Sequence, residues 1–151
     1  MSIKLAMKTV LILSIVSGCS SKPIDSTTIP QTGLKDCPDT NNCVSSETDD
    51  TRHKIEPFHL KGDTKESWLS IQQVLAAMPR TKIILATENT IHAECRSRIF
   101  RFVDDLELHL NPSNKRISIR SASRLGYSDF GVNRRRVEYL RHKLHAHNII
   151  E

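Results

Sequence analysis

Residues 106–120, LELHLNPSNKRISIR, decide the fold of this chain. Apolar and polar residues alternate on both sides of a short segment rich in turn-forming residues, with apolar positions at Leu106, Leu108, Leu110, Ile117 and Ile119. A period of two is typical of a half-buried strand, because successive side chains point to opposite faces of a sheet. The stretch therefore predicts an antiparallel hairpin with one apolar face.

Further strands and a helix precede this hairpin. Runs rich in β-branched residues at 81–87 and 90–96 flank Glu88 and Asn89, which predicts a second hairpin, and a short strand is expected near residues 55–60. Residues 64–78 show helical spacing, with an apolar stripe made of Trp68, Ile71, Leu75 and Met78. Asp63 and Glu66 fit a capping box at the start of this helix.

A last helix is predicted over residues 133–147, where Val137, Leu140 and Leu144 form a stripe and Asn133 is the expected N-cap. Together these elements predict an α+β fold, an antiparallel sheet of four or five strands packed on two helices.

The amino terminus has the pattern of a secretory signal. Lys4 and Lys8 precede an apolar run over residues 10–16, which is too short to span a bilayer. Small residues before Cys19 resemble a bacterial lipobox, and this resemblance implies cleavage after residue 18 and acylation of Cys19, with palmitate among the usual acyl groups. The alternative is an ordinary signal peptide in which Cys19 is incidental.

Acylated Cys19 would attach the protein to a membrane. The following Ser20 and Ser21, with no aspartate, resemble the sorting pattern for the outer membrane, so we expect a lipid-anchored envelope protein that faces the periplasm. Residues 19–35 are rich in Ser, Thr and Pro and are interpreted as a flexible tether. Residues 36–151 have the length of a single domain.

Charge is unevenly distributed along the chain. Residues 112–151 hold 9 Lys or Arg against 3 Asp or Glu, whereas residues 19–111 hold 11 against 14. The basic end suits an anionic ligand, or it is simply a solvated helix face. Nucleic acid is not expected as a partner, because no aromatic residues are interleaved with the arginines for base stacking.

The cysteines have different expected roles. Cys37 and Cys43 enclose a short turn-forming loop, so a disulfide is expected in an oxidising compartment. Zinc is the competing interpretation, but His53 and His59 lack finger-like spacing. Cys95 alternates with apolar residues, which predicts a buried structural thiol.

The segment over residues 120–134, RSASRLGYSDFGVNR, carries a further resemblance. Together with residues 37–46, the helix around Trp68 and residues 100–107, it resembles a bacterial family of unknown function, number 1499. The resemblance implies a small lipoprotein or membrane-associated protein, and it implies no reaction. His92 and Cys95 depart from the family pattern, where more aromatic or hydroxyl side chains are expected.

The same segment is the candidate ligand site. Two glycines permit a tight loop, and the positive end of the last helix and several arginines can hold an anion. The candidate ligand-binding residues are Arg120, Ser123, Arg124, Tyr127, Asp129, Asn133 and Arg134. The alternative is a structural lock, in which Asp104, Asp105 and Asp129 neutralise these arginines.

Catalysis is the less favoured function class. Asp104 and Asp105 are neighbours in a strand and face opposite ways, so they cannot form an acid–base pair, but either could pair with Asp129. The enzyme alternative uses Asp104, Asp129 and Arg124 on an envelope or lipid substrate. No cofactor is expected. Metal binding by His142 and His145 is less favoured than a simple interaction with the helix end. The favoured function is a non-catalytic envelope lipoprotein that binds an anionic envelope component or a partner protein; a purely structural lipoprotein is a third class.

Overall fold

The computed structural model describes residues 33–151. The expected signal peptide, Cys19 and nearly all of the expected tether lie outside the described residues. The elements along the chain are β1 (Cys43–Ser45), β2 (Phe58–His59), α1 (Thr64–Ala77), β3 (Thr81–Ala86), β4 (Thr90–Arg96), β5 (Val103–Asn111), β6 (Arg116–Ser123) and α2 (Val132–Ala146). Among these, no helix is long and apolar enough to cross a membrane.

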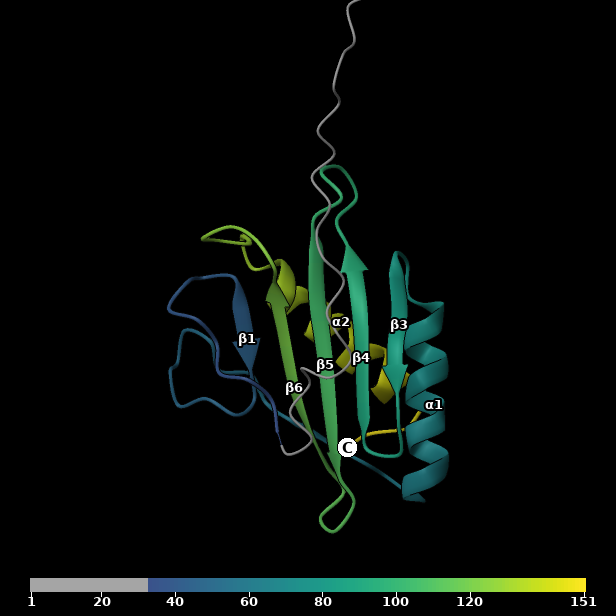
Figure 1. Cartoon of the computed structure of the whole chain (residues 1–151). Coiled ribbons are helices and arrows are strands. Elements are labelled where there is room, and N and C mark those ends of the chain that lie inside the picture. Colours follow the sequence, from purple (N-terminus) through teal and green to yellow (C-terminus); the bar gives the residue numbers. More distant parts are fainter. Residues whose placement is uncertain (1–32) are drawn as a thin grey trace, which may run out of the picture.

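One antiparallel sheet forms the centre of the domain (Figure 1). Its strand order is β1-β6-β5-β4-β3, and β2 pairs with the other end of β6. In the central hairpin Leu106 is opposite Ser121 and Leu108 is opposite Ile119, so the apolar faces of β5 and β6 coincide. This register confirms the hairpin predicted from residues 106–120.

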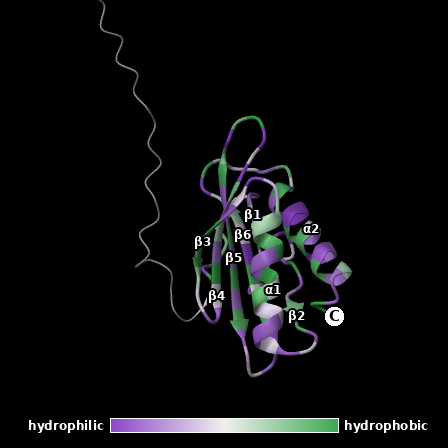
Figure 2. Ribbon diagram, turned by 90° about the vertical axis from the view of Figure 1, so that its right-hand side faces the viewer, coloured by the Kyte–Doolittle hydropathy of each residue, from purple (hydrophilic) through white to green (hydrophobic). Residues whose placement is uncertain are grey.

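Both helices pack on one face of the sheet, and the opposite face carries none (Figure 2). The predicted stripes of α1 and α2 are buried between helices and sheet. Leu75, Leu140 and Leu144 are fully inaccessible to solvent. Each helix has one apolar stripe, and the alternating strands give the sheet one apolar face. Packing the stripes against that face removes both surfaces from water.

The predicted α+β class is confirmed, with differences in detail. The sheet has six strands rather than four or five, because short segments at Cys43–Ser45 and Phe58–His59 add to the two ends of β6. Only part of the strand expected at 55–60 forms. Strands of two or three residues hold too few side chains to show an alternating pattern, so tertiary pairing creates them.

The start of α2 differs from the prediction. Its N-cap is Gly131, with φ of 78°, and not Asn133. The carboxylate of Asp129 accepts hydrogen bonds from the backbone N–H groups of Gly131, at 2.8 Å, and Asn133, at 2.7 Å. Asp129 therefore satisfies the free donors of the first turn, which leaves the Asn133 side chain available for the interior.

The disulfide between Cys37 and Cys43 is present, with Cα atoms 5.7 Å apart. It leads directly into β1 at the edge of the sheet. Closing so short a loop is worth about 2 kcal/mol in the loop-entropy model. Cys95 is buried and unpaired, as predicted.

Candidate functional site

The candidate arginines Arg120 and Arg124 lie on the face of the sheet that carries no helix, and both contact carboxylates. Arg120 donates to Glu107 at 2.8 Å. Arg124 donates to Asp105 at 2.8 Å and to Glu94 at 2.7 Å. Both arginine side chains are mostly buried, so this part of the candidate loop is a charge-paired network, although the buried Nε of Arg120 has no hydrogen-bond partner within residues 33–151.

Asp105 is the centre of that network. His92 Nε2 lies 2.8 Å from Asp105 Oδ1, and Arg124 binds both carboxylate oxygens. Burial by itself would raise the pKa of Asp105, but the hydrogen bonds from His92 and Arg124 outweigh it and lower the pKa to about 2. The carboxylate is therefore ionised and fully engaged at neutral pH.

A second polar network lies under the amino end of α2, on the helix-covered face. Arg136 donates to Asp104, Asn133 and Ser121. Ser121 donates to Asn133 at 2.7 Å, and both residues are inaccessible to solvent. Each polar group here finds a partner inside the protein, which is the condition for burying it without a large penalty.

The remaining candidates have separate surroundings. Asn133 donates through Nδ2 to the carbonyl of Asn42, at 2.9 Å, and to Ser123, at 3.1 Å, so it joins the helix to the disulfide loop and to the end of β6. Arg134 donates to backbone carbonyls of residues 52 and 54. Tyr127 is exposed on the loop. The predicted ligand residues thus do not converge on one pocket.

The candidate catalytic residues are also apart. Asp104 contacts Arg136 of α2 on the helix-covered face, whereas Asp105 and Arg124 meet on the other face. Asp129 accepts from the first N–H groups of α2. Since Asp104 and Arg124 lie on opposite sides of the sheet, they have no common substrate position.

A family model described as a protein of unknown function, DUF1499, matches residues 33–144. The chain belongs to the DUF1499 family. The match covers both polar networks and ends within α2, close to the limits of the folded domain. No curated protein and no solved structure matches the chain.

The end of β4 and the start of α2 lie at the same end of the sheet (Figure 1). The DUF1499 domain has another arginine cluster there. A pocket of about 400 Å³ is lined there by five arginines: Arg80, Arg96, Arg98, Arg135 and Arg136. We call it the arginine pocket. Within residues 33–151, only two of its arginines have a carboxylate partner, Arg96 with Glu94 and Arg136 with Asp104.

Three cations of the arginine pocket are not neutralised by the described part of the chain. Arg80 and Arg98 are exposed and make no side-chain hydrogen bond there. Arg135 donates only to the carbonyl of Phe130, at 2.9 Å. Guanidinium groups bind phosphate and carboxylate through paired hydrogen bonds, so this pocket suits an anion better than the loop of residues 120–134 does.

Cys95 and Thr81 also line the arginine pocket. Their side chains lie 3.7 Å apart, and burial raises the pKa of the Cys95 thiol although Arg136 acts in the opposite direction. A protonated thiol is a poor nucleophile. Cys95 thus belongs to the wall of the pocket rather than to a reactive centre.

In the part of the chain from residue 33 onward, no group of three or more His, Cys, Asp or Glu is arranged to hold a metal ion. His142 and His145 are exposed on the last turns of α2. Cys37 and Cys43 are bonded to each other and so are not available as zinc ligands.

Sequence reasoning missed the roles of Arg136 and of the arginine pocket. A signal for Arg136 existed, because residues 133, 136, 137, 140 and 144 share one helical face. An arginine on that stripe requires a buried acidic partner. No comparable signal existed for Arg80 and Arg98, which come from different turns and meet only through the sheet topology.

Proposed function

We propose that this DUF1499 protein is a non-catalytic envelope lipoprotein, attached through acylated Cys19, that binds an anionic envelope component in the arginine pocket. The sequence before Cys19 supports the attachment, and Ser20 and Ser21 support the outer membrane as its site. The disulfide between Cys37 and Cys43 supports an oxidising compartment such as the periplasm.

The excess of positive charge in the arginine pocket carries the binding proposal. Of its five arginines, three have no carboxylate partner within residues 33–151. Arg80, Arg98 and Arg135 come from the turn before β3, the loop after β4 and the first turns of α2. Three cations around one pocket repel each other unless an anion joins them, so a phosphate or carboxylate group is the ligand chemistry that fits.

The rest of the pocket wall supports a ligand with an apolar part beside its charge. Val132, Tyr139 and Met78 contribute to the lining next to the arginines. Sites for small molecules commonly combine apolar walls with a few placed polar groups. The proposed ligand therefore has a phosphate or carboxylate group attached to an organic body.

An enzyme that uses Asp104, Asp129 and Arg124 is the alternative, and the geometry does not favour it. Each of the three side chains is already bonded to a structural partner. Asp104 and Arg124 lie on opposite faces of the sheet, and Asp129 lies in the loop before α2. Binding without chemistry is the simpler role for the arginine pocket.

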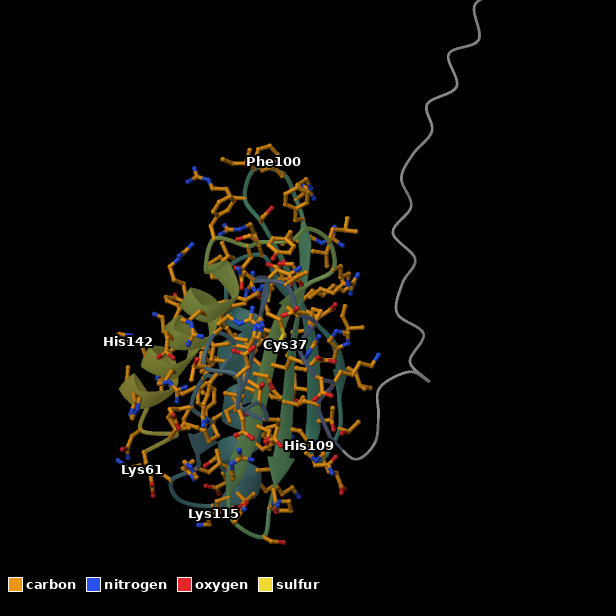
Figure 3. The ribbon with its side chains drawn as sticks, turned by 90° about the vertical axis from the view of Figure 1, so that its left-hand side faces the viewer. Cys37, Lys61, Phe100, His109, Lys115 and His142 are labelled. Carbon is orange, nitrogen blue, oxygen red and sulfur yellow. A yellow bond between two sulfur atoms is a disulfide. The ribbon has the colours of Figure 1, made fainter. Side chains whose placement is uncertain are left out.

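Titration with inorganic phosphate at constant ionic strength tests the binding proposal. The chain from Ser20 to Glu151 holds every core residue and so is the reference protein. We expect phosphate to raise its melting temperature, and the double variant Arg80→Gln, Arg98→Gln to bind phosphate at least about tenfold more weakly. The control is Lys61→Gln, Lys115→Gln, which removes the same positive charge at the opposite end of the domain (Figure 3). Because these lysines donate to Asn148 and to the carbonyl of Gly62, each response to phosphate is compared with the same protein without phosphate. Equal responses of all three proteins would contradict the proposal.

The mass of the full-length protein recovered from a membrane fraction tests the attachment. Processing should leave Cys19 as the first residue with acyl groups bound, and Cys19→Ser should abolish both the acyl mass and the membrane association. An unprocessed, unacylated chain would contradict the lipoprotein part of the proposal and leave the phosphate titration unaffected.

A further inference from the structure

Large apolar side chains are exposed mainly at one end of the domain. Of the ten exposed large hydrophobic residues described, six lie in the two loops that follow β4 and β6: Ile99, Phe100, Phe102, Leu125, Tyr127 and Phe130. We call them the apolar tip. Phe130 is 88% exposed and Ile99 is 79% exposed. Such a concentration of exposed apolar side chains on one surface indicates an interaction surface.

The loop after β4 is held in a defined shape that presents its side chains outward. Ser97 N–H donates to the carbonyl of Phe102, and Phe102 N–H donates to the hydroxyl of Ser97, both at 2.9 Å. The rings of Phe100 and Phe102 stack with centroids 5.6 Å apart. Phe100 lies at the far extremity of the domain (Figure 3). These rings therefore project into solvent instead of folding back onto the core.

The two loops of the apolar tip are neighbours. Arg124 N–H donates to the carbonyl of Val103 at 3.2 Å, which joins the start of the second loop to the end of the first. Both loops leave the sheet at the same end (Figures 1 and 2). A flat surface can thus contact both loops together.

Positive charge surrounds the apolar tip. Arg98 and Arg101 alternate with its apolar residues, and the loop at 97–102 has no acidic residue. Arg80 and Arg135 line the arginine pocket at the base of this loop. The one acid of the second loop, Asp129, is engaged by N–H groups of α2. Arginines beside aromatic and aliphatic side chains are complementary to the headgroup region of an anionic bilayer.

We propose that the apolar tip inserts into the surface of an anionic lipid bilayer, giving the domain a membrane contact of its own besides the attachment at Cys19. This inference rests on the proposed membrane location, and it is independent of which anion the arginine pocket binds. The bilayer, rather than a second copy of the chain, is favoured because like charges on two copies of this end would repel each other.

The length of the amino-terminal segment permits this orientation. Residues Gly33 and Leu34 lie beside Asn111 and Pro112, at the end of the sheet opposite the apolar tip. The 14 steps from Cys19 to Gly33 reach up to about 46–50 Å when extended, whereas the nine residues of β5 span about 30 Å. A chain attached at Cys19 can therefore lie with its tip on the same membrane.

Co-sedimentation with vesicles tests the proposal, using residues 20–151 so that no acyl chain contributes. We expect binding to vesicles of phosphatidylcholine mixed with phosphatidylglycerol, and much less to phosphatidylcholine alone. The tip variant Ile99→Ser, Phe100→Ser, Phe102→Ser should bind at least about tenfold more weakly. The matched control is Leu69→Ser, Ile84→Ser, which removes apolar side chains that are also exposed but lie on α1 and β3.

Several outcomes would overturn the inference. The wild-type domain could fail to bind anionic vesicles, or the tip variant could bind as well as the control. Self-association that is abolished in the tip variant, with no vesicle binding, would show an interface between copies instead. Vesicle binding without phosphate binding would support this inference and contradict only the proposal that the arginine pocket binds an anion. Circular dichroism of each variant establishes that it is folded.

Discussion

The polar face of the sheet and the arginine pocket are both rich in arginine, yet they differ in what the arginines contact. On the sheet, Arg120 and Arg124 bind the carboxylates of Glu107, Asp105 and Glu94. In the arginine pocket, Arg80 and Arg98 extend into solvent with no acid bonded to them among the described residues.

This difference separates stability from binding. Removing a guanidinium that is paired with a buried carboxylate destabilises the fold, and such a guanidinium has few free donors for a ligand. An exposed, unpaired guanidinium contributes little to folding and is available to an anion. Net charge along the chain does not distinguish the two cases. The two kinds of arginine are distinguished by whether a carboxylate is bonded to them. Three predictions test this distinction, from the largest expected effect to the smallest.

The largest effect is expected where an arginine is most deeply paired. Arg136 lies in the pocket wall but is bonded to Asp104, and their side chains are only 10% and 5% exposed. Arg136→Met keeps most of the apolar stem and leaves Asp104 buried without its counter-charge, so the free energy of unfolding should fall by about 3–5 kcal/mol in a urea titration. The double variant Asp104→Asn, Arg136→Met should recover part of that loss. A loss below about 1 kcal/mol for the single variant would mean that Arg136 contributes no more to stability than the unpaired arginines Arg80 and Arg98 do.

An intermediate effect is expected for Asp105, and it depends on pH. Its folded pKa of about 2 is below the ordinary value of 3.8, so the carboxylate contributes stability at neutral pH that is lost as pH falls from about 4 to 2. The shift corresponds to about 2 kcal/mol. The difference in unfolding free energy between wild type and Asp105→Asn should therefore shrink by about this amount between pH 6 and pH 2. A difference in unfolding free energy that is constant with pH would mean that His92 and Arg124 do not stabilise the ionised carboxylate of Asp105.

The smallest effect on stability is expected from the arginine pocket. The variant Arg80→Gln, Arg98→Gln removes two exposed, unpaired cations, so the free energy of unfolding should change by less than about 0.5 kcal/mol. Because the pocket arginines repel one another, we expect a slight gain in stability rather than a loss. A loss above 1 kcal/mol would show that these arginines have structural partners, and the comparison between the two regions would then fail.

Much of the fold was predictable from local patterns. The hairpin over residues 106–120, the hairpin of β3 and β4, and the apolar stripes of α1 and α2 follow from side-chain spacing, because alternation and helical periodicity are properties of contiguous residues. The buried state of Cys95 followed from the same alternation. The disulfide followed from loop length and turn residues.

The candidate site was predictable only in part. The sequence supplies the residue types of a polar network, and the pairing of Arg124 with Asp105 agrees with the structural-lock alternative. The prediction of Asn133 as N-cap was wrong because the helix begins earlier, at Val132, and the Asp129 carboxylate accepts from the N–H groups of Gly131 and Asn133. Local rules name suitable residues for a cap, but they cannot show which of two nearby candidates occupies it.

The order of residues along the chain by itself determined which segments are strands and helices, which of their faces are apolar, and which short loop a disulfide can close. Tertiary structure alone decided which arginines are neutralised. Arg80, Arg98 and Arg135 are separated by many residues and meet because β3, β4 and α2 reach the same end of the sheet. A charge pair forms over a few ångströms, and the sheet topology sets which charges come that close.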